Sequence, residues 1–240
     1  ELKQKMKDYQ PGNGVTFKFT GQMEEQAKEM GFLSKALLIA LFLVFLIIVT
    51  QFNSISSPAV IMTSVVLSLI GVFLGLIIFQ MDFVIIMTMI GIISLAGVVV
   101  NNAIVLIDFV ILLLQRKREE MKLTENEFLP LPVVIQCIAD SGAMRLRPVL
   151  LTAITTLLGL IPLAIGININ FITLLSDYDP QFFIGGDNVM FFGPLSWTVI
   201  FGLSFATFLT LVVVPVTYLL IFVLKRWVYK KTGWGLLKSY

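Results

Sequence analysis

Five long apolar segments dominate the chain, and short polar or mixed stretches separate them. A membrane-spanning helix needs about 20 mostly apolar residues. The third segment is longer than a bilayer requires, which indicates a tilted helix or one that continues past the membrane surface. The pattern predicts an all-α transmembrane bundle with spans at about Leu33–Thr50, Pro58–Phe79, Phe83–Leu114, Val149–Ile167 and Leu195–Leu224.

Two polar stretches suggest structure outside these spans. Val15–Thr20 alternates apolar and polar residues, which predicts a strand, and a polar helix at about Gln22–Met30 leads into the first span. Since one strand cannot form a sheet alone, residues 1–32 are expected to be a piece of a larger domain, and the chain a fragment of a longer polypeptide. Pro132–Met144 predicts a short amphipathic helix on the cytoplasmic face, before the fourth span.

The distribution of basic residues predicts the orientation of the bundle. The connection at about residues 168–194 has no Lys or Arg and carries three aspartates. Short cytoplasmic loops are enriched in Lys and Arg, so the C-terminus is expected in the cytoplasm and residues 1–32 outside. We expect the bundle at residues 33–225, followed by a cytoplasmic tail at 226–240. The basic residues behind this prediction are Arg116, Lys117, Arg118, Lys122, Arg145, Arg147, Lys225, Arg226, Lys230, Lys231 and Lys238.

Composition excludes several classes of function. Hydrophobic residues make up 58% of the chain and charged residues 13%, against about 25% charged in soluble domains. A net charge of +2 gives no footprint for nucleic acid. The chain has no histidine and one cysteine, Cys137, so no internal disulfide or histidine-ligated metal site is expected. With no nucleophile–base pair or phosphate-binding glycine loop, we expect neither an enzyme nor a cofactor.

The candidate functional residues begin with a polar cluster inside the third span. Asn101, Asn102 and Asp108 interrupt an otherwise apolar run. Asn101 and Asp108 are seven residues apart and are expected to form one stripe that faces the bundle. A carboxylate inside the membrane costs several kcal/mol, and such residues usually have a function. This favours a proton or cation relay. The alternative is hydrogen bonding between helices, at about 0.6 kcal/mol a contact.

Arg145 and Thr152 flank the start of the fourth span. Arg145 either anchors the helix at the interface or reaches inward to Asp108, and Thr152 either joins a relay or bonds its own backbone. Gly71 and Gly75 form a small-xxx-small pattern that permits close helix packing. The aromatic residues of the connection before the fifth span indicate an interfacial belt or a surface that admits hydrophobic substrates.

Three stretches carry a family resemblance. Gly97–Phe109, Arg145–Thr152 with Leu158–Ala164, and Gly193–Gly202 followed by Leu209–Tyr218 resemble the C-terminal membrane half of resistance-nodulation-cell division efflux permeases of the AcrB/AcrD/AcrF type. The resemblance covers nearly the whole chain in order. It implies that residues 1–32 end a periplasmic porter region and that the five spans are the eighth to twelfth of twelve.

The resemblance also implies a function and partners. These permeases are homotrimeric proton/substrate antiporters of the bacterial inner membrane, which export drugs or other hydrophobic compounds with a periplasmic adaptor and an outer-membrane channel. In the family, two acidic residues in the fourth of the twelve spans face a lysine and an asparagine in the tenth. Asn101 stands at the position of that lysine and Asn102 at that of the asparagine. The charge of the two carboxylates must therefore be balanced differently here. Asp108, Arg145 and Thr152 match other positions near the relay. The remaining half of the permease is then an obligatory partner, and membrane lipid surrounds the assembly. The chain alone is expected to be inactive.

Two alternatives remain open. One is a complete small membrane subunit of a protein-export complex resembling SecF, which would need a starting Met and a sixth span. The other is a membrane scaffold that transports nothing. The gene sequence upstream of Glu1 separates the permease fragment from the small subunit.

Overall fold

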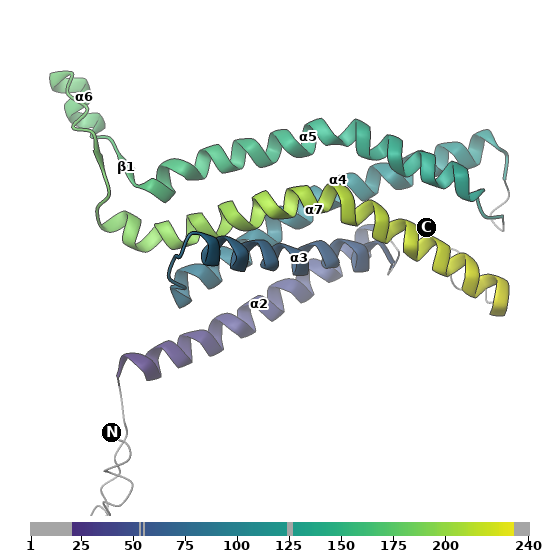
Figure 1. Cartoon of the computed structure of the whole chain (residues 1–240), viewed down its shortest axis with the longest axis horizontal. Helices are drawn as coiled ribbons and strands as arrows, with labels where there is room; N and C mark the ends of the chain where they lie inside the picture. The colour runs from purple at the N-terminus through teal and green to yellow at the C-terminus, as the bar shows by residue number, and fades with distance from the viewer. Residues whose placement is uncertain (1–20, 53, 55, 124–126, 233–240) are drawn as a thin grey trace, which may run out of the picture.

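The structure is a computed structural model, and it describes residues 21–52, 54, 56–123 and 127–232. Five long helices lie roughly parallel or antiparallel, and a small hairpin with a short helix projects from one end (Figure 1). The predicted strand Val15–Thr20 lies outside the described residues. The elements are α2 (Gln22–Phe52), α3 (Ser56–Ile78), α4 (Ile85–Glu120), α5 (Leu131–Ile165), β1 (Ile167–Asn168), α6 (Phe171–Asp177), β2 (Phe183–Ile184) and α7 (Asp187–Thr232).

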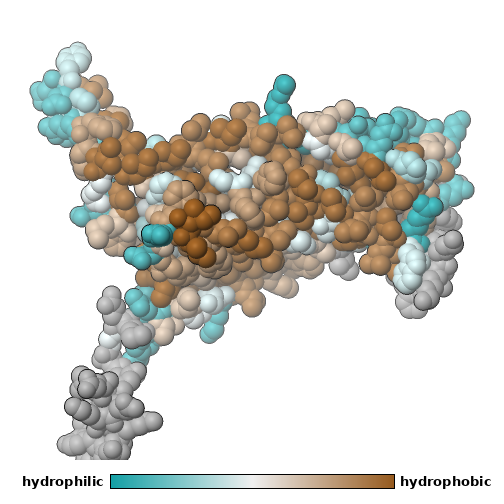
Figure 2. Space-filling view, in the orientation of Figure 1, coloured by the Kyte–Doolittle hydropathy of each residue, from teal (hydrophilic) through white to brown (hydrophobic). Residues whose placement is uncertain are grey.

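The predicted fold class is confirmed, since α2, α3, α4, α5 and α7 are each long and apolar enough to cross a membrane. The polar helix expected before the first span is the first part of α2. An apolar surface covers the middle of the bundle, and hydrophilic residues gather toward its ends (Figure 2). Many exposed large side chains in this middle region are apolar, such as Leu38, Phe42, Val66 and Leu158, as lipid-facing helix surfaces require.

The predicted separate amphipathic helix at Pro132–Met144 is wrong. This segment is the first part of α5, which continues to Ile165 as one helix with Pro148 inside it. Proline is favoured in the first turn of a helix, and the sequence therefore also fits a span that begins at Val149, directly after Pro148. A proline within a membrane helix is nevertheless tolerated where neighbouring groups satisfy the freed carbonyl.

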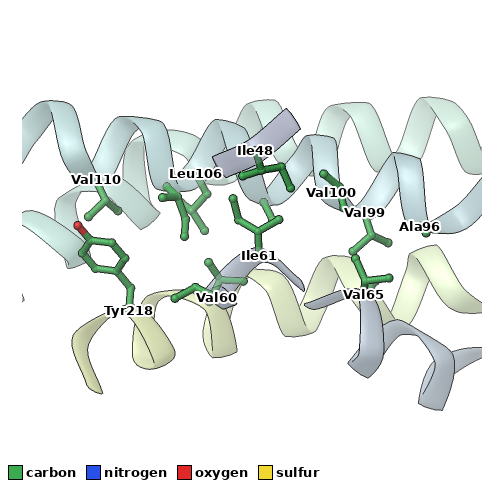
Figure 3. Close-up of a cluster of buried hydrophobic side chains, with 14 of the residues drawn as sticks. Ile48, Val60, Ile61, Val65, Ala96, Val99, Val100, Leu106, Val110 and Tyr218 are labelled. Carbon is green, nitrogen blue, oxygen red and sulfur yellow. The ribbon is translucent and has the colours of Figure 1, made fainter. Parts of the chain in front are cut away.

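α7 is the central helix of the described bundle, because it packs against α3, α4 and α5. It begins at Asp187, earlier than expected, and contains Pro194 and Pro215. The core is apolar where α2, α3, α4 and α7 meet (Figure 3). Its side chains there include Ile48, Val60, Ile61, Val65, Val99, Leu106, Val110 and Tyr218.

Glycines set the close contact between α3 and α7. A Cβ atom added at Gly71 or Gly75 of α3 would overlap the side chain of Phe205 or Phe201 of α7. The ring of Phe201 also stacks on Phe79, with 4.9 Å between their centroids, so it cannot move aside freely. The small-xxx-small pattern in α3 is therefore a packing surface, as its spacing suggests.

Candidate functional site

The candidate site lies along α4, where polar residues flank its buried apolar stripe. The apolar stripe includes Val99, Ala103, Leu106 and Val110 and belongs to the common core. Asn102 lies at the edge of this stripe and is 6% exposed. Since successive residues of a helix are about 100° apart, Asn101 lies on another side and is exposed.

Asn102 and Thr152 form a polar contact between α4 and α5. The Thr152 hydroxyl lies 3.3 Å from Asn102 Oδ1 and 2.9 Å from the carbonyl oxygen of Val149, one turn earlier in α5. A hydroxyl has one proton, so the two acceptors share it. Thr152 thus makes the expected bond to its own backbone and also contacts Asn102, and its part in a relay stays a prediction.

A second polar contact lies two helical turns away. The guanidinium carbon of Arg145 in α5 lies 4.4 Å from the centroid of the Phe109 ring in α4. This is a cation–π geometry, and such contacts contribute about 0.5–1 kcal/mol when exposed and more when desolvated. The Nε atom of Arg145 is buried and donates no hydrogen bond within the described structure.

The two contacts share one register. Asn102 and Phe109 are seven residues apart on α4, and Arg145 and Thr152 are seven apart on the antiparallel α5. Seven residues span about 10.5 Å of helix, close to two full turns, so both contacts lie on matching faces. Phe109 was not singled out from the sequence. Its seven-residue spacing from Asn102, matched by the spacing on α5, is the signal that could have identified it.

For the described residues, one expectation about this cluster is wrong, and one of the two alternatives for Arg145 is not observed. Asn101 and Asp108 do not face the bundle, because both side chains are exposed. Arg145 does not reach Asp108, and neither residue forms a salt bridge within the described part of the chain. The larger apolar stripe of α4 takes the core-facing side, which turns Asn101 and Asp108 outward. Together they form an open polar stripe on α4 beside the contact with α5.

The fold and this polar helix pair define a multi-pass membrane protein. Residues 1–169 match the sequence model of the AcrB/AcrD/AcrF family. The chain belongs to this family of resistance-nodulation-cell division permeases.

Individual relatives agree with this assignment. The chain is 34% identical over 186 residues to the swarming motility protein SwrC of Bacillus subtilis, which covers 78% of this chain and 15% of SwrC. It is 30% identical over 190 residues to the multidrug resistance protein MdtC of Erwinia tasmaniensis, covering 79% of this chain and 15% of MdtC.

A solved structure is also similar. The crystal structure of a heavy metal efflux pump matches with a TM-score of 0.65 and 27% identity, over 92% of this chain and 18% of that one. The chain thus spans less than a fifth of the length of SwrC, MdtC and this pump.

Proposed function

We propose that this chain is the C-terminal membrane half of a proton-driven efflux permease, and that the open stripe on α4 belongs to its ion-coupling site. The observation that supports this most is the paired contact of α4 with α5 beside that stripe. There, an amide and a hydroxyl, then an arginine on an aromatic ring, hold polar groups within apolar helices. Intramembrane ionisable groups are costly, which favours a functional role for Asp108 and Arg145.

The remaining half of the permease is the proposed partner of this stripe. Asn101 and Asp108 would face its carboxylates, which pick up and release protons during transport. Because Asn101 is neutral, it would orient such carboxylates through its amide without neutralising their charge. The chain alone would lack these carboxylates and would not transport, and its role in the assembly is transport rather than catalysis.

The proposed assembly is a homotrimer in the bacterial inner membrane that works with a periplasmic adaptor and an outer-membrane channel. The basic helix ends and the C-terminus would lie in the cytoplasm, and the hairpin at residues 166–186 in the periplasm. Drugs or other hydrophobic compounds are the proposed substrates, in line with the name of MdtC. Metal ions are the second candidate, because the matching crystal structure is that of a heavy metal efflux pump.

The test is export by the full-length permease that contains this chain, carrying Asn101→Ala, Asn102→Ala or Asp108→Asn one at a time. Everted vesicles would be energised with a proton gradient and supplied with a fluorescent dye or with Zn²⁺. We expect Asp108→Asn to abolish proton-driven export, since an amide cannot take up and release a proton as a carboxylate does. We expect Asn101→Ala and Asn102→Ala to weaken export.

Equal amounts of trimer in the membrane are the control for these variants. Ser204→Ala on α7 serves as the matched control, because its exposed hydroxyl only donates to the carbonyl oxygen of Ile200 in its own helix. Unchanged export in all three test variants would mean that the cluster only packs the helices. Export of Zn²⁺ but not of dye would replace the hydrophobic substrate class with metal ions.

A further inference from the structure

The hairpin between α5 and α7 is an ordered element of its own. We call residues 166–186 the α6 hairpin; it consists of β1, α6 and β2, with Ile167 paired to Ile184 and Asn168 to Phe183. The family match ends at residue 169, so it assigns no role to α6. In Figure 1 the hairpin projects sideways from the end of the bundle, away from α7.

Hydrogen bonds fix the base of this hairpin. α5 ends at Gly166, which has a φ of 75°, a conformation that favours glycine, and its N–H donates to the Pro162 carbonyl at 2.9 Å. Gly185 N–H donates to Gly166 O at 2.9 Å. The Asn168 amide donates to both Gly166 O and Gly185 O, at 2.9 and 2.7 Å. The hairpin is therefore held at a defined place relative to the ends of α5 and α7.

The short helix α6 is held just as firmly. Asn170 caps it, because its side-chain oxygen accepts hydrogen bonds from the N–H groups of Ile172 and Thr173. The Asn170 N–H donates to the carbonyl of Pro180, which ties the start of α6 to the segment that leads into β2. Within α6, Thr173 and Leu174 are half-buried, whereas the other five residues are exposed. α6 thus presents a fixed outer face.

This outer face is apolar, and the described residues leave most of it uncovered. Phe171, Ile172 and Leu175 lie within about 100° of one another around the helix axis, and are 67%, 80% and 83% exposed. Tyr178, which ends α6, is 90% exposed. Soluble surfaces rarely hold such apolar groups together unless something binds them. The opposite side carries the exposed Asp177.

Three observations indicate what covers this face. The hairpin joins the ends of two membrane-spanning helices, so it is tethered at the membrane surface at both ends. Exposed apolar side chains recur from the end of α5 to the start of α6, at Leu163, Ile165, Ile167, Ile169 and Phe171. In Figure 2 the same apolar colour runs from the bundle into the base of this projection, and hydrophilic residues cover its tip.

Charge agrees with a lipid partner. Residues 148–224 contain no Lys or Arg, and their only acids are Asp177, Asp179 and Asp187. Asp177 lies on the side of α6 opposite its apolar face, and Asp179 is an exposed residue just beyond the end of α6. They stay in water if that face is in lipid, since a buried carboxylate would be costly.

We propose that α6 lies in the headgroup region of the membrane surface where α5 ends, with Phe171, Ile172 and Leu175 inserted among the acyl chains. Interfacial helices bury such faces about 5–10 Å below the surface, with their polar side in water. The α6 hairpin then fixes the height of the α5–α7 connection in the bilayer. This inference depends on membrane insertion and not on proton coupling, so it stands or fails separately from the proposed function.

The experiment uses the full-length permease in vesicles of phosphatidylethanolamine and phosphatidylglycerol, in a background without other reactive cysteines. Spin labels are placed singly at Ile172→Cys, Leu175→Cys and Asp177→Cys, where Asp177 is the matched control on the opposite side of α6. Collisions with oxygen, which concentrates in lipid, and with a water-soluble nickel chelate are measured. We expect the oxygen-to-nickel ratio to be several-fold higher at Ile172 and Leu175 than at Asp177.

Two outcomes would overturn the proposal. Nickel accessibility at Ile172 and Leu175 equal to that at Asp177 would leave the face in water. Low accessibility to both reagents would mean that protein covers it, either another part of the permease or a partner. As a further check, Leu175→Asp should raise nickel accessibility at a label on Ile172, whereas Asp177→Asn, on the opposite side of α6, should not. An equal response to both would also contradict insertion.

Discussion

The contact of α3 with α7 and the contact of α4 with α5 are built in opposite ways. Between α3 and α7, glycines admit bulky aromatic rings, and the fit leaves no space for another side chain. Between α4 and α5, the helices are bridged by an amide with a hydroxyl and by an arginine on an aromatic ring, and the adjoining stripe of α4 is open. Tight apolar packing favours one arrangement, because any shift creates overlap or voids. Polar bridges can exchange partners, so the second contact is suited to the movements that the proposed transport would require.

The largest effect is expected from filling the α3–α7 contact. Gly75→Ala places a methyl group on the Phe201 side chain, and overpacking of this kind costs roughly 1–3 kcal/mol. We expect a lower thermal unfolding temperature in detergent, measured by the fluorescence of a thiol-reactive dye. Gly159→Ala is the matched control, because nothing lies within 4 Å of the added Cβ atom. Equal unfolding temperatures for Gly75→Ala and Gly159→Ala would contradict the tight packing of α3 against α7.

The next effect is expected at Arg145 and Phe109. A double-mutant cycle of Arg145→Gln and Phe109→Leu should give a coupling free energy of about 1 kcal/mol, since each change removes one partner of the cation–π contact. Arg145→Lys should keep part of this coupling. The measurement is unfolding of the permease in detergent with increasing dodecyl sulfate. A coupling near zero would mean that the two side chains are adjacent without interacting.

A smaller effect is expected at Thr152 and Asn102. The same cycle with Thr152→Val and Asn102→Ala should give about 0.6 kcal/mol, the average for hydrogen bonds between membrane helices. Thr152→Ser keeps the hydroxyl and is the control. A coupling well above that of Arg145 with Phe109 would reverse the order of the two contacts.

The smallest effect is expected at Ser141. Its hydroxyl is fully buried, yet it lies 3.5 Å from the carbonyl oxygen of Leu106, at the limit of a hydrogen bond. We expect Ser141→Ala to change the unfolding free energy by less than about 0.5 kcal/mol, because alanine fills nearly the same volume. A loss as large as that of Gly75→Ala would show that the α4–α5 pair is also held by tight packing.

The five spans could be predicted because each needs only length and low polarity, which the sequence shows directly. The course of α5 could not, because Pro148 has the same local signature inside a membrane helix as at its start. The choice between Asn101 and Asn102 as the buried amide also required the structure. Two adjacent residues differ only in direction, and the packing of Val99, Ala103 and Leu106 determines which one turns inward.

The α6 hairpin was expected only as an aromatic connection. Its strands are two residues each, too short for alternation to be seen, and its helix depends on the cap at Asn170 and on bonds to Pro180 and Gly185. Each of the bonds to Pro180 and Gly185 joins residues ten or more positions apart, whereas the strands have two residues each, so no local sequence pattern indicates the pairing. The aromatic composition was visible, but the side on which it lies was not.

The lengths of α4 and α5 have a mechanical consequence. With 36 and 35 residues, each helix extends over about 50 Å, whereas the hydrocarbon core of a bilayer is about 30 Å thick. The excess forms a two-helix rod at the end that carries Arg116 and Arg118, stiffened by the buried Leu114, Val134 and Cys137. A rotation of about 10° between the helices within the membrane would move a tip about 20 Å away by about 3–4 Å. A small change in helix packing near Asn102 would therefore produce a larger displacement of the helix ends at the membrane surface.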